Sequence, residues 1–379
     1  MRRARWLAPW KDSTERPVIY HCVTRVVERR LAFGPEDKEK FRTFMRMYEN
    51  FSGCRVLAYC LMCNHVHILL EVPPMPVGGL SDAELLKRLR ALYNEVEVGL
   101  VAKELKAARE AVGQGLADES YVAAIHERFT YRMHDLGEFM KTLLARFTRW
   151  FNGGHQRTGA LWESRFKSVL VEEGIASRTM AAYIDLNPVR AGMVEDPALY
   201  RWSSYGEAMG GGAKGNGGKA RGGLVRAIMA HKGYGADARH WKGAVSKDYR
   251  MILLAEGIEK LREEVDPPTP RLRRTGAEGK LQVKVVRKGM KKEVSAEEMA
   301  RLERRRDLRM RQMLRYRVRY FSDGVAIGSR GFVDGVFKAC RERFSARRTS
   351  GARRMRGAGA AAAGVIWSAR DLKVGVGES

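Results

Sequence analysis

The sequence is poor in cysteine and has no long apolar run. Five cysteines in 379 residues are too few for a disulfide framework. No segment has the apolar length of a membrane-spanning helix, and the basic start of the chain lacks the apolar core of a secretory signal. We therefore expect a soluble, cytoplasmic protein with no membrane partner.

Acidic residues are also scarce relative to basic ones. The chain has 70 Lys and Arg against 44 Asp and Glu, which gives a formal net charge of +26. Residues 271–379 alone contain 29 basic and 11 acidic residues, a balance of +18. A charge this large favours a polyanionic partner, and nucleic acid is the commonest one.

The chain is long enough for two domains, or for one domain with extensions. A glycine-rich stretch at 207–223 predicts a flexible linker between a first region at 1–206 and a basic, mainly helical region at 224–379. In the last region, a helix, a glycine-containing turn and a second helix beginning near Ser329 suggest a DNA-binding helix-turn-helix. Its basic charge would hold the polyanion, while the first region would supply the chemistry.

The first region alternates short strands with helices. Its patterns predict strands at 18–27, 55–61, 65–72 and 166–172, and helices at 35–50, 136–151 and 176–186. This β-α-β-β-α-β order, followed by one more helix, is that of a ferredoxin-like or RRM-like antiparallel sheet backed by helices. The predicted fold class is therefore α+β.

Two histidines lie in the third predicted strand. Because side chains alternate along a strand, His65 and His67 point to the same face, about 7 Å apart along the strand. They are able to hold one metal ion if a third ligand approaches them, although paired histidines also simply line polar sheet faces. A zinc site that adds Cys60 and Cys63 is disfavoured, because residues so close in one hairpin cannot easily surround an ion.

The helix predicted at 176–186 brings a tyrosine next to an asparagine. Tyr183 and Asn187 are four residues apart and therefore share one helix face, and Pro188 marks the end of the helix. A hydroxyl that can act as a nucleophile thus lies beside an amide oxygen that can bind a metal. The same pattern also fits an ordinary helix end with a buried tyrosine and a capping asparagine.

Together these stretches resemble the single-tyrosine HUH transposases, and most closely the REP-associated tyrosine transposases. The resemblance covers roughly residues 15–206 and rests on an ordered set of motifs, namely Tyr20–Arg25, His65–His67, Gly159–Ser168, Tyr183–Gly192 and Trp202–Tyr205. Small family members lack the helical stretch at 81–133 and the residues after Tyr205. In family terms the 81–133 insertion is a DNA-contacting arm, a dimer contact or a solvated helical pair.

The resemblance implies a metal-dependent endonuclease that cuts single-stranded DNA, often at the foot of a hairpin, and rejoins strands. Tyr183 would be the nucleophile and form a 5′-phosphotyrosine, while His65, His67 and Asn187 would bind Mg²⁺ or Mn²⁺. Single-stranded or hairpin DNA would be the partner, a homodimer is compatible with the family, and the protein would act in the cytoplasm at the nucleoid.

Weaker candidates are predicted to contact DNA directly, namely Arg25, Arg165, Lys167, Arg190 and Trp162. The Trp162 ring is suited to stacking on a base, but it also fits a protein core.

Two other functions fit parts of the sequence. A catalytically inactive regulator on a transposase scaffold would bind DNA hairpins without cutting them, but all four predicted active-site residues are present. An RNA-binding protein with an RRM-like sheet would share the fold, but the chain lacks a convincing aromatic RNP stretch.

Overall fold

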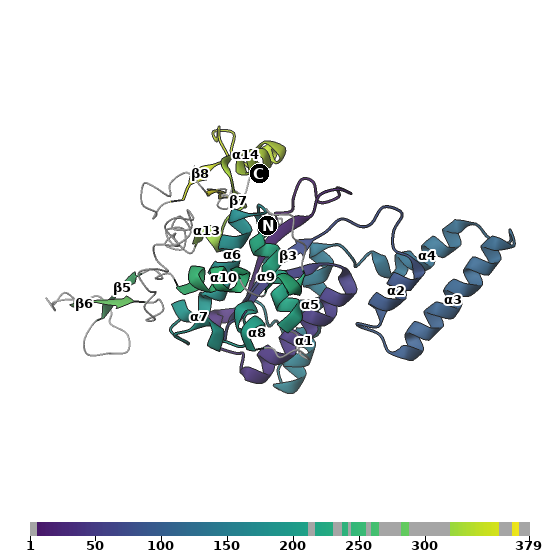
Figure 1. Ribbon diagram of the computed structural model, residues 1–379, viewed down its shortest axis with the longest axis horizontal. Coiled ribbons are helices and arrows are strands. Elements are labelled where there is room, and N and C mark those ends of the chain that lie inside the picture. Colours follow the sequence, from purple (N-terminus) through teal and green to yellow (C-terminus); the bar gives the residue numbers. More distant parts are fainter. Residues whose placement is uncertain are drawn as a thin grey trace.

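A seven-stranded mixed sheet forms the centre of the molecule, in the order β2-β3-β1-β4-β7-β9-β8. The computed structural model describes residues 6–210, 217–229, 237–241, 244–254, 259–264, 282–287, 319–355 and 366–370. Helices cover both faces of the sheet, and an arm of three helices projects from the body (Figure 1). The fold is α+β, as predicted.

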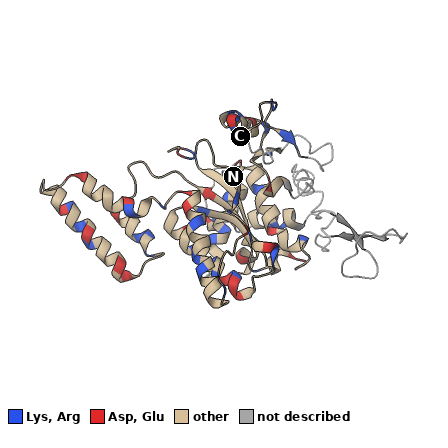
Figure 2. Cartoon of the chain, turned by 180° about the vertical axis from the view of Figure 1, so that it is seen from behind, with Lys and Arg blue, Asp and Glu red and all other residues tan. Residues whose placement is uncertain are grey.

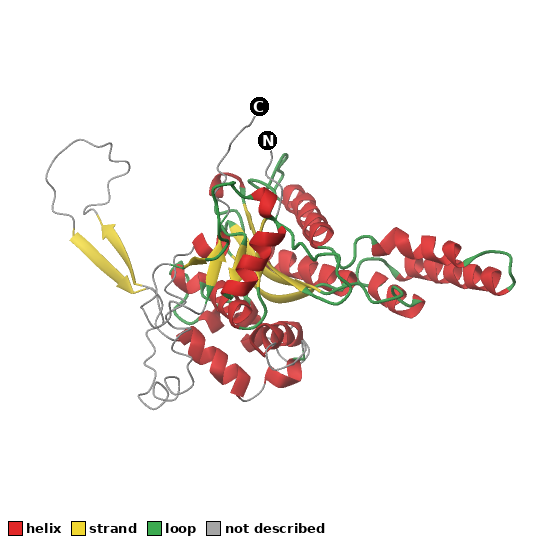
Figure 3. Ribbon diagram, turned by 90° about the horizontal axis from the view of Figure 1, so that it is seen from above, coloured by secondary structure: helices red, strands yellow, loops and turns green. Residues whose placement is uncertain are grey.

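The elements expected from the first region all form. They are β1 (Val18–Arg25), α1 (Pro35–Ser52), β2 (Arg55–Leu61), β3 (His65–Val72), α5 (Leu136–Gly154), β4 (Lys167–Val171) and α6 (Ile175–Asp185). Strand β1 pairs antiparallel with β3 on one side and β4 on the other, and β3 also pairs antiparallel with β2. The β-α-β-β-α-β order is confirmed, and Figure 3 shows its strands sandwiched between helices.

The two faces of the sheet bury different sets of side chains. Along β3, Val66 and Ile68 pack in the cluster that contains the apolar residues of α1 and α5. Leu69 points the other way and packs in the cluster of α6. The alternation expected for this strand therefore holds, and it directs the two histidines of β3 toward α6.

The last part of the chain extends the same sheet. Helix α13 (Arg319–Ser322) is followed by β7 (Ala326–Gly328), α14 (Arg330–Ala339), β8 (Arg353–Arg354) and β9 (Trp367–Ala369). Strand β7 runs parallel to β4, and the Leu170 N–H donates to the Val325 carbonyl at 2.9 Å.

This arrangement corrects two expectations. The described residues after 206 do not form a separate helical unit, because their strands supply hydrogen-bond partners to an edge of β4 that would otherwise be unpaired. The first helix expected for the helix-turn-helix, at 293–319, lies almost entirely outside the described residues, but the turn expected before Ser329 is instead the buried strand β7, which pairs with β4 and β9.

The glycine-rich stretch is partly helical and not a linker throughout. Helix α8 (Ser204–Gly210) includes its first four residues, and α9 (Gly217–Met229) includes its last seven. A Cβ atom at Gly223 would overlap the carbonyl oxygen of Val56 in β2. The glycine therefore allows the helix backbone to approach the strand closely, a role that composition alone does not distinguish from flexibility.

The remaining described elements are short. They are η1 (Val27–Arg29), α7 (Asn187–Arg190), η2 (Pro197–Leu199), η4 (Ala238–Trp241), α10 (Ala244–Leu254), η5 (Arg341–Arg343) and the two-stranded sheet of β5 (Glu259–Glu264) and β6 (Gln282–Arg287). No helix in the described ranges is long and apolar enough to span a membrane.

The insertion forms the arm, which consists of α2 (Asp82–Leu89), α3 (Glu95–Gly113) and α4 (Glu119–Thr130). These helices share a small apolar core of their own. Residues 82–130 contain nine acidic and seven basic residues, and opposite charges lie side by side on the helices (Figure 2). Arg128, for example, pairs with Glu104 at 2.7 Å. The arm therefore lacks the excess of basic over acidic residues that is expected of a DNA-binding surface.

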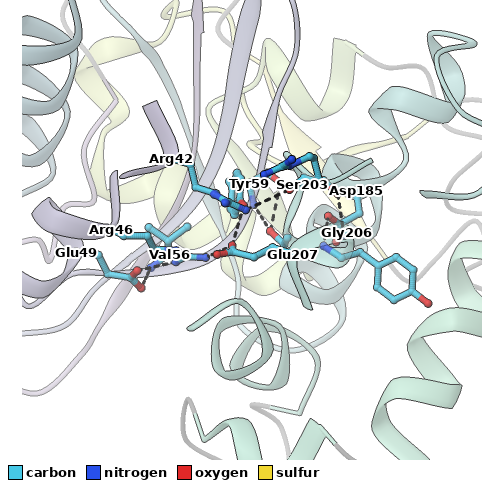
Figure 4. A network of polar contacts seen from close by, with 12 residues as sticks. Arg42, Arg46, Glu49, Val56, Tyr59, Asp185, Ser203, Gly206 and Glu207 are labelled. Atoms are coloured by element: carbon cyan, nitrogen blue, oxygen red, sulfur yellow. Dashed lines mark hydrogen bonds and ion pairs between the residues drawn. The ribbon is translucent and has the colours of Figure 1, made fainter. Parts of the chain in front are cut away.

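A buried ion-pair network connects α1 and α8 with the strand β2 (Figure 4). The Arg46 guanidinium in α1 contacts Glu49 and Glu207, each at 2.6 Å. Glu207 in α8 also accepts the Tyr59 hydroxyl at 2.7 Å. Paired and hydrogen-bonded in this way, the buried charges join α1, β2 and α8.

We predict that Gly223→Ala destabilises the protein by about 1–3 kcal/mol, because its Cβ would push α9 away from β2. Gly218→Ala in the same helix is the matched control, since a Cβ there meets no other atom within 4 Å. Urea unfolding monitored by circular dichroism measures both. Equal stability of the two variants would contradict the close approach.

Candidate active site

Tyr183 lies near the end of α6 and faces the sheet, with 1% of its surface exposed. Asp185, two residues after Tyr183, holds the end of α6 in place through two hydrogen bonds. This buried carboxylate accepts the N–H of Tyr205 at 2.9 Å and the hydroxyl of Tyr249 at 2.7 Å. The tyrosine therefore occupies a rigid position between the helix and the histidine face of the sheet.

Four side chains surround the Tyr183 ring. The imidazoles of His67 and His21 meet it edge to face, with centroids 5.8 and 6.0 Å away. Phe321 of α13 stacks on it at 4.5 Å, with an interplanar angle of 14°. The Arg190 guanidinium lies over the ring at 4.8 Å from its centroid.

Both histidines of β3 use their Nδ1 atoms for hydrogen bonds. His65 Nδ1 lies 2.7 Å from Asn64 Oδ1, and His67 Nδ1 lies 2.9 Å from His21 Nε2. The His65 and His67 rings are close, with centroids 4.9 Å apart. Nε2 is therefore the atom through which each ring can bind a cation.

Burial keeps these imidazoles neutral. It lowers the pKa of His21 to about 4 and, with help from the nearby Arg25 charge, the pKa of His65 to about 4. The pKa of His67 is lowered well below its ordinary value by burial and by its two histidine neighbours. Since a metal binds the unprotonated nitrogen, the rings can act as ligands at neutral pH.

The phenol of Tyr183 is also neutral in this environment. Burial raises its pKa, whereas the positive charges of Arg190 and Arg25 and a hydrogen bond with Asn187 oppose that rise. Burial also disfavours the charged form of Arg190, and it therefore lowers the pKa of this guanidinium. A phenolate formed here would therefore gain its stabilisation from nearby positive charge.

Asn187 follows one turn after the tyrosine. Its Nδ2 donates to the carbonyls of Tyr183 and Ile184, at 3.0 and 3.3 Å, so its Oδ1 is the amide atom able to bind a cation. Two imidazole nitrogens and one amide oxygen fit a divalent ion of the Mn²⁺ type, with further positions for water or phosphate oxygens.

The described ranges contain no group of three His, Cys, Asp or Glu side chains placed to hold a metal. The alternative zinc site with Cys60 and Cys63 is therefore not formed. Cys60 is fully buried, and the sulfur of Cys63 lies 3.3 Å from Lys38 Nζ. A metal site here depends on Asn187 as the third protein ligand.

The predicted DNA contacts separate into two groups. Arg25, Arg165 and Lys167 are exposed at the end of the sheet where β3 begins, since Arg25 pairs with His65 and Lys167 pairs with Val23. Lys167 also lies 3.4 Å from Asp323. These cations lie beside the histidine pair.

Trp162 and Arg190 are turned inward. The Trp162 ring packs among phenylalanines such as Phe33 and Phe147, and its N–H donates to Thr148 at 2.9 Å. Arg190 covers the tyrosine ring. Their surroundings fit a structural role for Trp162 and an electrostatic one for Arg190.

Two site residues, His21 and Phe321, were not among those predicted. His21 lies in the first strand diagonally across from His67, because it pairs with Leu69. His21 lies within the motif Tyr20–Arg25, and it shares one face of the strand with Arg25. These two features of the sequence could have identified it. Phe321 is 138 positions after Tyr183, and its neighbouring residues carry no such signal.

Comparison with known proteins finds a similarity to transposases over part of the chain. Residues 15–77, which include both β3 histidines, match the family described as Transposase IS200 like, in agreement with the broader family that the motifs resemble. A solved structure of a REP-associated tyrosine transposase bound to a REP hairpin is similar with a TM-score of 0.32 and 12% identity, over 65% of this chain and 92% of that one. Curated protein sequences give no match.

We predict that His65→Ala and His67→Ala each weaken Mn²⁺ binding by about 100-fold or more, since each would remove a predicted direct ligand and the loss of a supporting partner alone costs about 10–100-fold. Isothermal titration calorimetry without DNA measures this directly. His155→Ala is the control, because His155 is partly exposed and pairs with Asp37 outside the site. Unchanged affinity in both β3 variants would remove the metal site.

Proposed function

We propose that this protein is a single-tyrosine HUH transposase, a metal-dependent endonuclease that cuts single-stranded DNA at hairpins and rejoins it. The observation that carries the proposal is the position of Tyr183 against the His67 ring, with His65 beside it and Asn187 one turn on. His67 and His65 thus lie beside Tyr183, and the predicted third ligand, Asn187, follows Tyr183 by one helical turn. The match of residues 15–77 to a transposase family supports this function in general terms.

The reaction would proceed by attack of the Tyr183 oxygen on a backbone phosphorus. The new bond joins tyrosine and phosphorus, and the bond from phosphorus to the 3′ oxygen breaks. The products are a 5′-phosphotyrosine and a 3′-hydroxyl, which forms when the leaving 3′ oxygen takes up a proton. Since no water is consumed, the phosphodiester energy is retained, and a 3′-hydroxyl can reverse the step to rejoin strands.

Burial disfavours the deprotonated form of Tyr183, and the positive charges of Arg190 and Arg25 offset part of this cost during attack. The phenol is neutral at rest, and its proton leaves as the new bond forms. Arg190 places positive charge over the ring at that stage. A divalent ion bound by His65, His67 and Asn187 would supply further positive charge to the phosphate oxygens.

The surface around the site suits a DNA strand. The exposed cations Arg25, Arg165 and Lys167 gather where β3 begins, next to His65. Basic and acidic residues are mixed over the body in Figure 2, and most of the +26 charge of the chain comes from residues 271–379, which carry +18. The near-neutral arm is not needed for this electrostatic attraction.

We predict that Tyr183→Phe abolishes the covalent DNA adduct, because it removes the attacking oxygen but leaves the ring packing. A labelled hairpin oligonucleotide from repeats flanking the gene is incubated with protein and Mn²⁺ or Mg²⁺, then run on a denaturing gel. Hairpin binding by Tyr183→Phe should change little.

Tyr205→Phe is the matched control, as Tyr205 is another fully buried tyrosine on the same side of the sheet. It should form the adduct normally. An undiminished adduct in Tyr183→Phe would exclude Tyr183 as the nucleophile. Tight hairpin binding by the unmodified protein without any adduct would favour a DNA-binding regulator.

We also predict that Arg25→Gln weakens hairpin binding and reduces the dependence of log affinity on log salt by about 0.7–0.9, the value for one lost phosphate contact. Fluorescence anisotropy at several salt concentrations gives this slope. Lys103→Gln, an exposed lysine of the arm, should leave the slope unchanged. Equal effects of the two substitutions would mean that Arg25 does not contact a phosphate.

A further inference from the structure

A chain of hydrogen bonds runs from the last third of the sequence to the histidine pair. The Phe321 carbonyl lies 2.6 Å from His21 Nδ1, and His21 Nε2 lies 2.9 Å from His67 Nδ1. The His21 and His67 rings are nearly parallel, with an interplanar angle of 10°. All three residues are buried, so water does not compete for these bonds.

The chemistry of the atoms fixes the direction of each bond. A carbonyl oxygen only accepts, so His21 Nδ1 must carry the proton that is donated to Phe321. In a neutral imidazole the other nitrogen then has a lone pair, so His21 Nε2 accepts. His67 Nδ1 must therefore donate, which leaves the lone pair of His67 on Nε2.

His21 itself cannot serve as a ligand in this arrangement, because both of its nitrogens are engaged. We propose that His21 and the Phe321 carbonyl form a positioning relay that holds His67 in the tautomer and orientation needed to bind the metal through Nε2. This inference rests on the proposed function and assigns a role to a segment outside the matched residues 15–77. Supporting partners of this kind orient metal-binding histidines and raise their basicity.

The position of Phe321 explains why its carbonyl is available. Phe321 lies in the four-residue helix α13, and the last carbonyls of a helix lack partners within the helix. Strand β7 follows at once and pairs with β4, so the sheet holds the segment in place. The Phe321 side chain stacks on Tyr183, so this one residue contacts both the nucleophile and the histidine relay.

Substitutions at His21 test the relay through metal binding alone. His21→Leu introduces an apolar side chain of similar size and removes both hydrogen bonds. It should weaken Mn²⁺ binding by about 10–100-fold. His21→Gln keeps an acceptor for His67 Nδ1 and should bind Mn²⁺ within a few-fold of the unmodified protein. Calorimetry with Mn²⁺ and no DNA gives the affinities.

Nitrogen NMR provides a readout that a purely structural role would not change. Long-range proton–nitrogen spectra of the metal-free protein should show His67 protonated at Nδ1, both in the unmodified protein and in His21→Gln. In His21→Leu, a mixture of the two His67 tautomers is expected. If His21→Leu does not fold, the tautomer in the unmodified protein and the His21→Gln affinity still decide the question.

The outcomes separate this relay from the function on which it rests. Protonation of His67 at Nε2, or unchanged Mn²⁺ affinity in His21→Leu, would overturn the relay even if the Tyr183 adduct forms. Equal, severe losses in His21→Gln and His21→Leu would make His21 a direct ligand and would also overturn it. No Mn²⁺ binding by the unmodified protein would instead contradict the proposed function at its metal site.

Discussion

The antiparallel pairing of β1 with β3 determines which side chains meet at the site. Its register places His21 diagonally across from His67 and Arg25 directly opposite His65. A slip of one residue would move every one of these groups to the other face, among the apolar side chains that pack on α1 and α5. Burial of the large apolar cluster on the face toward α1 and α5 therefore fixes the strand register, and this register keeps the polar side chains together on the face toward α6.

Burial then gives the polar groups their chemical state. The same exclusion of water lowers the histidine pKa values and raises that of Tyr183, so all four rings are neutral at rest. Charge enters through Arg190, whose guanidinium lies over the phenol. Neutral imidazoles with directed lone pairs and a neutral phenol under a cation are the chemical states that the proposed metal binding and phosphate attack require.

Local pattern was sufficient to predict the first region. The hairpin with His65 and His67 and the helix with Tyr183 were expected within a residue or two of where they form, because period and turn residues define such elements. The sheet neighbours of β4 were beyond reach, since β7 is three residues long and pairs with a strand about 160 positions earlier. Gly223 was misread for a related reason, because only the fold shows that a strand backbone approaches it. The sequence thus pointed to the residues on β3 and α6 that lie around Tyr183, whose roles as ligands and nucleophile stay predictions, but not to the contacts of Phe321.

The hydrogen bond between His21 and Phe321 joins residues 300 positions apart. During synthesis the histidine strand, the tyrosine helix and the cations around them all leave the ribosome long before Phe321 does. The nascent chain therefore carries every predicted ligand and the nucleophile while His67 still lacks its fixed orientation. In terms of the proposed relay, a chain that stopped before α13 would contain Tyr183, His65, His67 and Asn187 but not the carbonyl that orients His21.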